Sequence, residues 1–355
     1  MNFPAAHIFP SPEPRIARRR IYPLFLPFSG CAARCVFCAQ PAQTGKAPTS
    51  IAAALERAEH DLLGREGEGR LPPDLLDLAF FGGTFTALEP QDFRACLDFA
   101  VRWQERGLIR HVRCSTRPDA VDAPRLASLK AAGFSLLELG VQSFDDAALT
   151  VSRRGYSADD ARRACALVQS SGLDLGIQLM PGLPGAGGSG GCSSTKSAMR
   201  DVEECAALAP SCARLYPCLV LEGTPLAKAW RQGGYAPWTA DQALDFLGPA
   251  CLALWRAGVP VIRIGLAPEA GLGKNILAGP WRPDLGGMAK GLALYLYLAE
   301  RIWRGSAQNP ITLHAPRAWQ GAFWGWRGAL EPRYAALGLS RGNVHWWGRD
   351  YFALL

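Results

Sequence analysis

Three cysteines near the start of the chain have the spacing of a metal centre. Cys31, Cys35 and Cys38 form a C-x3-C-x2-C array that directly follows the apolar run 21–28. Cysteine thiolates hold iron–sulfur clusters, and a cubane cluster normally takes four of them. Three thiolates from one loop therefore leave one iron open to a substrate or a cofactor. The spacing predicts an iron–sulfur centre that performs chemistry.

Three other interpretations of this array are disfavoured. A disulfide does not suit a chain whose first residues lack the apolar core of a secretory signal. Zinc needs a fourth ligand, and no nearby histidine supplies one at the usual spacing. Unrelated core cysteines follow the periodicity of helices and strands and do not crowd into one loop.

The residues around the array resemble a known family. Phe37 precedes the last cysteine, and 23–40, PLFLPFSGCAARCVFCAQ, is similar to the radical half of the elongator catalytic subunit family, within the radical S-adenosylmethionine superfamily. The resemblance implies a [4Fe-4S] cluster on the three cysteines and S-adenosyl-L-methionine as a second cofactor. It further implies a 5′-deoxyadenosyl radical that abstracts hydrogen from an unidentified substrate.

A glycine pair follows the second predicted strand, 77–81. Gly82 and Gly83 have no Cβ, so a ligand can approach the main chain, and carbonyl oxygens there can accept hydrogen bonds from an ammonium group. The resemblance implies that the step Gly82-Gly83-Thr84 holds the methionine amino group, and that Phe37 is a further cofactor contact.

The resemblance implies further cofactor contacts at the ends of the following strands. Gln142 and Arg154 match the positions that contact the ribose and the methionine carboxylate, and an arginine fork suits a carboxylate. Arg153 is the neighbouring alternative. Met180 lies in a segment similar to the one that contacts adenine.

Three more polar residues at these strand ends are candidate cofactor contacts whose roles stay open. Ser115 and Gln178 stand where relatives carry other side chains. Glu138 lies in an apolar strand, where an unpaired carboxylate is costly, so we expect it to point into the barrel toward a partner. Arg117 either braces Asp119 or serves the cofactor.

Strand and helix patterns alternate from residue 21 to about 265. Alternation with short connections forces a parallel sheet with right-handed crossovers. Six such units, fewer than the eight of a closed barrel, predict an α/β fold: a partial (β/α)6 TIM-like barrel with a small C-terminal α+β appendage. The cysteine loop follows the first strand, where parallel barrels carry their sites.

The pattern divides the chain into four parts. We expect an irregular lead-in over 1–20, the radical core over 21–265, a helical extension over 266–310 and an aromatic-rich unit over 311–355. The tryptophans of the last part are interpreted as a packed small core, with base stacking as the alternative.

Composition narrows the class of protein. Of 355 residues, 49% are apolar and 19% charged, which supports a sizeable core and excludes wholesale disorder. Most of the eight remaining cysteines are interpreted as reduced core residues, with a second cluster on Cys192, Cys205, Cys212 and Cys218 as the disfavoured alternative. No apolar run reaches the roughly 18 residues that span a bilayer, so we expect a cytoplasmic protein with no membrane partner.

The net charge of +7 suits either an RNA partner or an ordinary basic surface. The segments 214–217 and 222–226 favour the elongator branch, whose acetyltransferase half has no counterpart in this sequence. We expect a radical enzyme with tRNA as a candidate substrate and an electron donor such as flavodoxin or ferredoxin; its oligomeric state stays open. The alternatives are an iron–sulfur electron-transfer or sensing protein and a porphyrin-like small-molecule radical oxidase.

Overall fold

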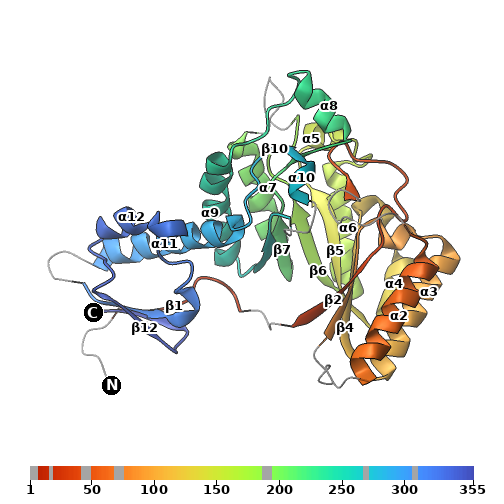
Figure 1. Ribbon diagram of the computed structural model, residues 1–355, viewed down its shortest axis with the longest axis horizontal. Helices are drawn as coiled ribbons and strands as arrows, with labels where there is room; N and C mark the ends of the chain where they lie inside the picture. The colour runs from red at the N-terminus through yellow and green to blue at the C-terminus, as the bar shows by residue number, and fades with distance from the viewer. Residues whose placement is uncertain are drawn as a thin grey trace.

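A curled parallel sheet of seven strands forms the centre of the protein (Figure 1). The structure is a computed structural model, and it describes residues 7–15, 19–40, 49–67, 76–185, 194–266, 272–305 and 311–355. The strand order is β2-β3-β4-β5-β6-β7-β9, and each pairing is parallel. The strands are β2 Arg20–Phe25, β3 Leu76–Phe81, β4 Ile109–Thr116, β5 Phe134–Gln142, β6 Asp174–Leu179, β7 Cys212–Leu215 and β9 Val261–Ile264. The predicted partial barrel is confirmed.

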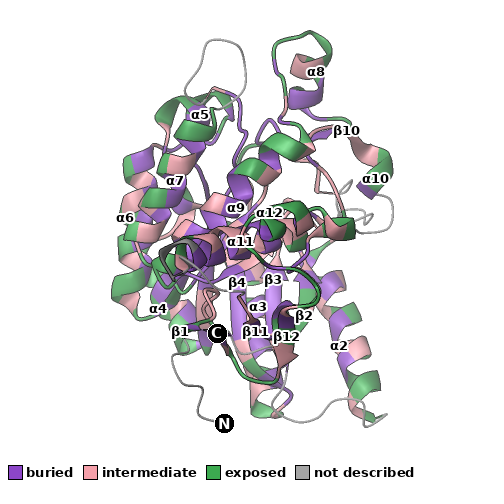
Figure 2. Cartoon of the chain, turned by 90° about the vertical axis from the view of Figure 1, so that its left-hand side faces the viewer, coloured by how far each residue is buried: buried purple, intermediate pink, exposed green. Residues whose placement is uncertain are grey.

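Helices α2, α3, α4, α6, α7 and α9 pack on the strands of this sheet, and the helices have both buried and exposed residues (Figure 2). Two of them begin with a capping box, in which a side chain and the main chain bond reciprocally: Ser157 with Asp160, and Thr239 with Gln242. The helices are α2 Ile51–Gly67, α3 Pro90–Glu105, α4 Ala123–Ala131, α5 Asp146–Val151, α6 Ala158–Ser171, α7 Thr195–Ala207, α8 Pro225–Arg231, α9 Ala240–Arg256, α10 Leu272–Asn275, α11 Leu285–Gly305 and α12 Glu331–Ala335.

The sixth strand of the barrel is shorter than its sequence predicts. The apolar run 213–219 favours a strand throughout, but β7 ends at Leu215. Pro217 has no N–H to continue the ladder. The chain runs on to the short strand β8 Val220–Leu221, which pairs antiparallel with β10 Ile276–Ala278.

A second sheet lies beside the barrel and joins the two ends of the chain. Its order is β1-β13-β11-β12, with β1 His7–Pro10, β13 Tyr351–Leu354, β11 Leu313–Pro316 and β12 Val344–Trp347. The lead-in was expected to be irregular, and this is wrong for residues 7–10. Phe9 is buried against Phe352, with ring centroids 5.5 Å apart, so packing rather than strand propensity fixes this segment.

The aromatic side chains of the C-terminal part pack together, as the first of the two interpretations predicted. Phe323 lies against Trp324, Tyr334 and Trp346, with ring centroids 4.2 to 5.3 Å apart. The core continues into the barrel helices, because the rings of Trp255 on α9 and Trp319 lie 5.8 Å apart. The boundaries proposed for the four parts remain a prediction.

Two further expectations concern cysteines and membranes. Seven of the eight cysteines outside the array are buried, as expected of core residues, and the eighth, Cys192, lies outside the described residues. None of the helices in the described ranges combines the length and the hydropathy that crossing a bilayer requires.

Candidate active site at the end of the first barrel strand

The cysteine loop and the glycine pair interlock at the ends of β2 and β3. Cys31 Sγ lies 3.2 Å from Thr84 Oγ1, and the Thr84 N–H donates to Ser29 O at 2.7 Å. A Cβ at Gly83, whose φ is +61°, would stand 2.1 Å from Ser29 O, and one at Gly30 would stand 2.3 Å from Thr84 O. Only glycine fits these two close approaches.

Gln40 links the two interlocked loops through its side chain. Its side-chain oxygen accepts hydrogen bonds from the Phe28 N–H at 2.5 Å and from the Gly83 N–H at 3.2 Å. Sequence reasoning missed Gln40, although its place two residues after the last cysteine of the array is a signal that could have found it.

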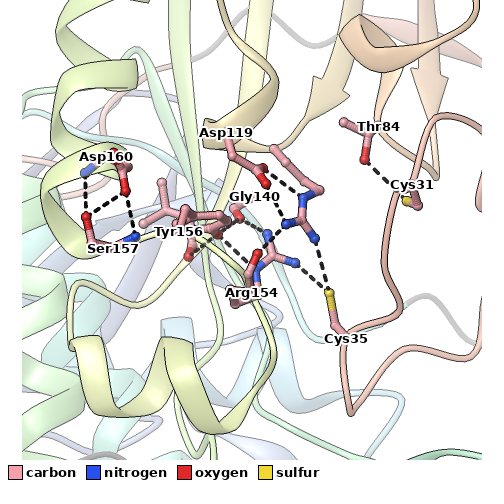
Figure 3. A network of polar contacts seen from close by, with 11 residues as sticks. Cys31, Cys35, Thr84, Asp119, Gly140, Arg154, Tyr156, Ser157 and Asp160 are labelled. Carbon is pink, nitrogen blue, oxygen red and sulfur yellow. Dashed lines mark hydrogen bonds and ion pairs between the residues drawn. The ribbon is translucent and has the colours of Figure 1, made fainter.

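Arg154 reaches the second cysteine of the array from the loop after α5. Its Nη1 donates to Cys35 Sγ at 2.9 Å, its Nη2 to Gly140 O at 2.6 Å and its Nε to Tyr156 Oη at 2.9 Å (Figure 3). The side chain is buried. Burial opposes the charged form, yet the adjacent Tyr156 and Cys35 raise the pKa of Arg154 above its ordinary value. The site therefore holds a buried, permanent cation.

A second guanidinium approaches the same thiol. Arg117 pairs with Asp119 through two hydrogen bonds of 2.8 Å, as one of the two sequence interpretations held. Arg117 Nη2 also donates to Arg154 O, and its Nη1 lies 3.7 Å from Cys35 Sγ. The reach of Arg117 to the cysteine loop was not predicted.

Cys38 completes the array and is held in an apolar setting. Burial, followed by the charges of Cys35 and Cys31, raises the pKa of the Cys38 thiol to about 12. The loop between these thiols is anchored from both sides, because the Val36 N–H donates to Ser152 O and the Leu226 N–H to Val36 O. The three thiols are thus close enough to influence one another.

The donor set fits a thiolate-held cluster with a second ligand nearby. Within the described ranges, no three His, Cys, Asp or Glu side chains already stand at metal-ligand spacing. The chemistry of the donors is nevertheless that of iron–sulfur ligation, with three thiols on one anchored loop. Close to Arg154, Gln142 Oε1 is buried without a hydrogen-bond partner among the described residues, which marks a place for a polar ligand.

Gln142 is held in an unusual backbone conformation. Its φ is +68°, the ladder between β5 and β6 shifts register just before it, and its carbonyl accepts from the Met180 N–H at 2.8 Å. A left-handed non-glycine residue costs free energy and is often found at ligand sites. Gln142 and Met180 are therefore brought together at one strand end.

Ser115, Glu138 and Gln178 form a separate group inside the barrel. Gln178 Nε2 donates to Glu138 Oε2 at 3.1 Å and to Ser115 Oγ at 3.3 Å. The partner expected for Glu138 is Arg214, whose Nη2 donates to Glu138 Oε1 at 2.8 Å and whose Nε donates to Oε2. Glu138 is only 1% exposed, and Arg113 Nη1 lies 3.7 Å from it. That these three residues contact a cofactor stays a prediction.

Comparison with known proteins identifies relatives for most of the chain. The family model of the Radical SAM superfamily matches residues 25–187, and that of the Radical SAM C-terminal domain matches residues 210–291. A tRNA uridine(34) acetyltransferase of Methanocaldococcus infernus is 31% identical over 197 residues, which cover 50% of this chain and 36% of the relative. The human Elongator complex protein 3 is 27% identical over 236 residues, which cover 58% of this chain and 41% of the relative.

A solved structure shares the fold. The archaeal Methanocaldococcus infernus Elp3 with an N-terminal deletion superimposes with a TM-score of 0.56 at 22% identity, covering 83% of this chain and 70% of that one. The matched segments span about a third to a half of the length of the curated relatives. The two family matches and the shared barrel agree with the cysteine array, and the chain belongs to the radical SAM superfamily.

Proposed function

We propose that this enzyme binds a [4Fe-4S] cluster through Cys31, Cys35 and Cys38 and cleaves S-adenosylmethionine beside it. The observation that carries the proposal is the interlocked pair of loops, in which three thiols and a glycine step share one anchored end of the barrel. The chemistry that the two cofactors supply when bound is one-electron reduction of a sulfonium, which yields a carbon radical able to remove hydrogen from a substrate.

The chain's own contribution is to bind and orient. The carbonyl oxygens of Gly82 and Gly83 are the proposed acceptors for a ligand ammonium group, and the missing Cβ of Gly83 lets this step lie against Ser29 O of the cysteine loop. Arg154 is a buried cation with fixed orientation, suited to an anionic group such as a carboxylate or a thiolate. Buried apolar side chains enclose this region and keep water out, among them Val36, Phe37 and Leu226.

We further propose that the substrate is tRNA. The relatives named tRNA uridine(34) acetyltransferase support this, as does the net charge of +7, because basic proteins gain affinity for RNA by neutralising phosphates. A flavodoxin or a ferredoxin is the proposed electron donor. A cytoplasmic location belongs to the same proposal, since free cysteines persist in a reducing compartment.

Anaerobic reconstitution tests the chemistry. The protein is loaded with iron and sulfide, then incubated with dithionite and S-adenosylmethionine, and the products are separated by chromatography. We expect about four irons per chain and 5′-deoxyadenosine that depends on the reductant. Iron loading without 5′-deoxyadenosine would favour the electron carrier over the radical enzyme, and zinc in place of iron would contradict the whole proposal.

Two measurements test the substrate. Filter binding of bulk tRNA at two salt concentrations should show affinity that falls steeply with salt. Modified nucleosides in tRNA from cells with and without the gene should differ by at least one species. Identical nucleoside profiles together with salt-independent binding would exclude tRNA and favour a small-molecule substrate.

A further inference from the structure

A large cavity lies at the end of the barrel opposite the cysteine loop. Its volume is about 1310 Å³, and it is lined by the first residues of the barrel strands, by α11 and by parts of the second sheet. Residues such as Ile21, Asp77 and Asp174 begin their strands, whereas the cysteine loop follows the end of β2. The cavity therefore enters the barrel from the N-terminal ends of the strands.

Positive charge predominates in this cavity. Eight arginine or lysine side chains line it, against four aspartates or glutamates. Arg113 and Arg214 project from β4 and β7, and the ring of Phe81 lies near both, 5.6 Å and 5.2 Å from their guanidinium carbons. Arg263 on β9 stands next to Arg214 in the strand register. Three arginines thus face the inner end of the cavity from the barrel wall.

The arginines outnumber the carboxylate that neutralises them. Glu138 accepts two hydrogen bonds from Arg214 and one from Gln178, so both of its oxygens are already engaged. Arg113 makes only a longer contact with this carboxylate: its Nη1 lies 3.7 Å from Glu138 Oε1. It is 9% exposed, and its Nε has no hydrogen-bond partner among the described residues. A buried guanidinium without a full set of acceptors is costly, and an anionic ligand would supply them.

One more polar atom without a partner lines the same cavity. His111 Nε2 is buried and lacks a hydrogen-bond partner in the described part of the chain, whereas Asp77 Oδ1 lies 3.7 Å from Arg19 Nη1. Buried polar atoms in folded proteins are nearly always satisfied, so Arg113 Nε and His111 Nε2 together indicate a missing polar ligand.

We propose that this cavity binds a phosphate group, held by Arg113 and Arg263, while Arg214 stays paired with Glu138. The surplus of cations favours phosphate over a singly charged carboxylate, because a phosphate monoester carries close to two charges and three acceptor oxygens. The phosphate enters from the N-terminal ends of the strands, and the site stands on its own contacts, apart from the proposed radical chemistry.

Calorimetric titration of the full chain with inorganic pyrophosphate tests the site without any cofactor. Arg113→Gln should weaken binding at least tenfold, because a hydrogen bond to a charged group is worth about 1.5–3 kcal/mol. Glu138→Gln should tighten it, since the competing carboxylate is neutralised. Arg102→Gln is the matched control: this arginine lies on α3, outside the barrel, and pairs with Glu59. It should bind like the unmodified chain.

Parallel titrations identify the source of the phosphate. A mononucleotide that binds as pyrophosphate does supports a small substrate, whereas a short RNA that binds more tightly than either, with the same loss in Arg113→Gln, supports a phosphate of RNA. Succinate binding as tightly as pyrophosphate would overturn the phosphate assignment.

Equal affinities of Arg113→Gln and Arg102→Gln would overturn the site itself. If circular dichroism shows that Arg113→Gln does not fold, Arg263→Gln takes its place with the same expected loss. Failure of S-adenosylmethionine cleavage leaves this result unaffected, because the titration contains neither cofactor nor reductant.

Discussion

The guanidinium Nη1 of Arg154 lies 2.9 Å from Sγ of Cys35. The contact joins the loop after α5 to the cysteine loop, two segments that are 119 residues apart. Arg154 is also fixed by Gly140 O and Tyr156 Oη, so its orientation is set before a ligand arrives. A cation held in place in this way binds an anion without the cost of ordering a long side chain.

Arg154→Gln should lower the affinity for S-adenosylmethionine by about 10- to 100-fold, the range expected for losing hydrogen bonds from a buried charged donor. Equilibrium dialysis against the labelled cofactor measures this. Arg153→Gln is the matched control, since Arg153 is the adjacent arginine and is exposed. If the control loses affinity and Arg154→Gln does not, the carboxylate contact belongs to Arg153.

Cys35→Ala should abolish iron binding while the barrel stays folded, because the side chain lies in a loop at the strand ends rather than among the packed helices. Iron per chain after anaerobic reconstitution is the measurement. Cys251→Ala, which removes a buried thiol of α9, should retain full iron. Full iron loading in the Cys35 variant would contradict the ligand assignment.

Gly83→Ala should cost more stability than Gly107→Ala, although both residues have positive φ. The strain of a left-handed alanine is common to both. A Cβ at Gly83 additionally meets Ser29 O at 2.1 Å, whereas one at Gly107 meets nothing within 4 Å. We expect the Gly83 variant to lose about 1–3 kcal/mol more in urea unfolding and to release iron. Equal losses would show that the two loops do not interlock.

Asp201 should make stability depend on pH. Burial raises the pKa of its carboxyl to about 6 from 3.8, opposed by hydrogen bonds from the Phe144 N–H and Ser143 Oγ and assisted by the charges of Asp145 and Glu204. The folded chain thus binds more protons than the unfolded chain between these pH values, and the free energy of unfolding falls as pH rises through them.

Asp201→Asn does not titrate: its Oδ1 can still accept from the Phe144 N–H, and its Nδ2 can donate to Ser143 Oγ in place of the bond that the carboxylate accepts from that hydroxyl. From about pH 4 to about pH 7, its free energy of unfolding should rise relative to the unmodified chain by up to about 3 kcal/mol, at about 1.4 kcal/mol per pKa unit. Urea titrations at the two pH values measure the difference. Parallel pH profiles of the two proteins would contradict the assignment.

The barrel and the cysteine array follow from the sequence because each depends on local pattern. Apolar runs at strand spacing predict the sheet, and Cys31, Cys35 and Cys38 carry their chemistry in residue type and spacing. The sequence predicts that Glu138 has a partner, because a buried carboxylate needs one. That this partner is Arg214 depends on which strands become neighbours.

The sequence pattern did not predict the contacts that long side chains make between distant strands and loops. Arg117 reaches Cys35, and Arg113 faces the inner cavity, only because the sheet curls and brings distant strands together. Neither residue carries a local signal that separates it from an ordinary surface arginine. The strand at 7–10 was not predicted for the same reason: it pairs with β13, which is far away in the sequence.

The pairing of β1 with β13 has a consequence for biosynthesis. His7 meets Leu354, so the ribosome completes one strand of this pair long before it makes the other. Until then β1 has no partner, and the small sheet cannot close while the barrel, whose strands follow one another in sequence, is free to assemble. The second sheet can therefore close only after β13 has been made, and residues next to that strand then complete the lining of the arginine-lined cavity.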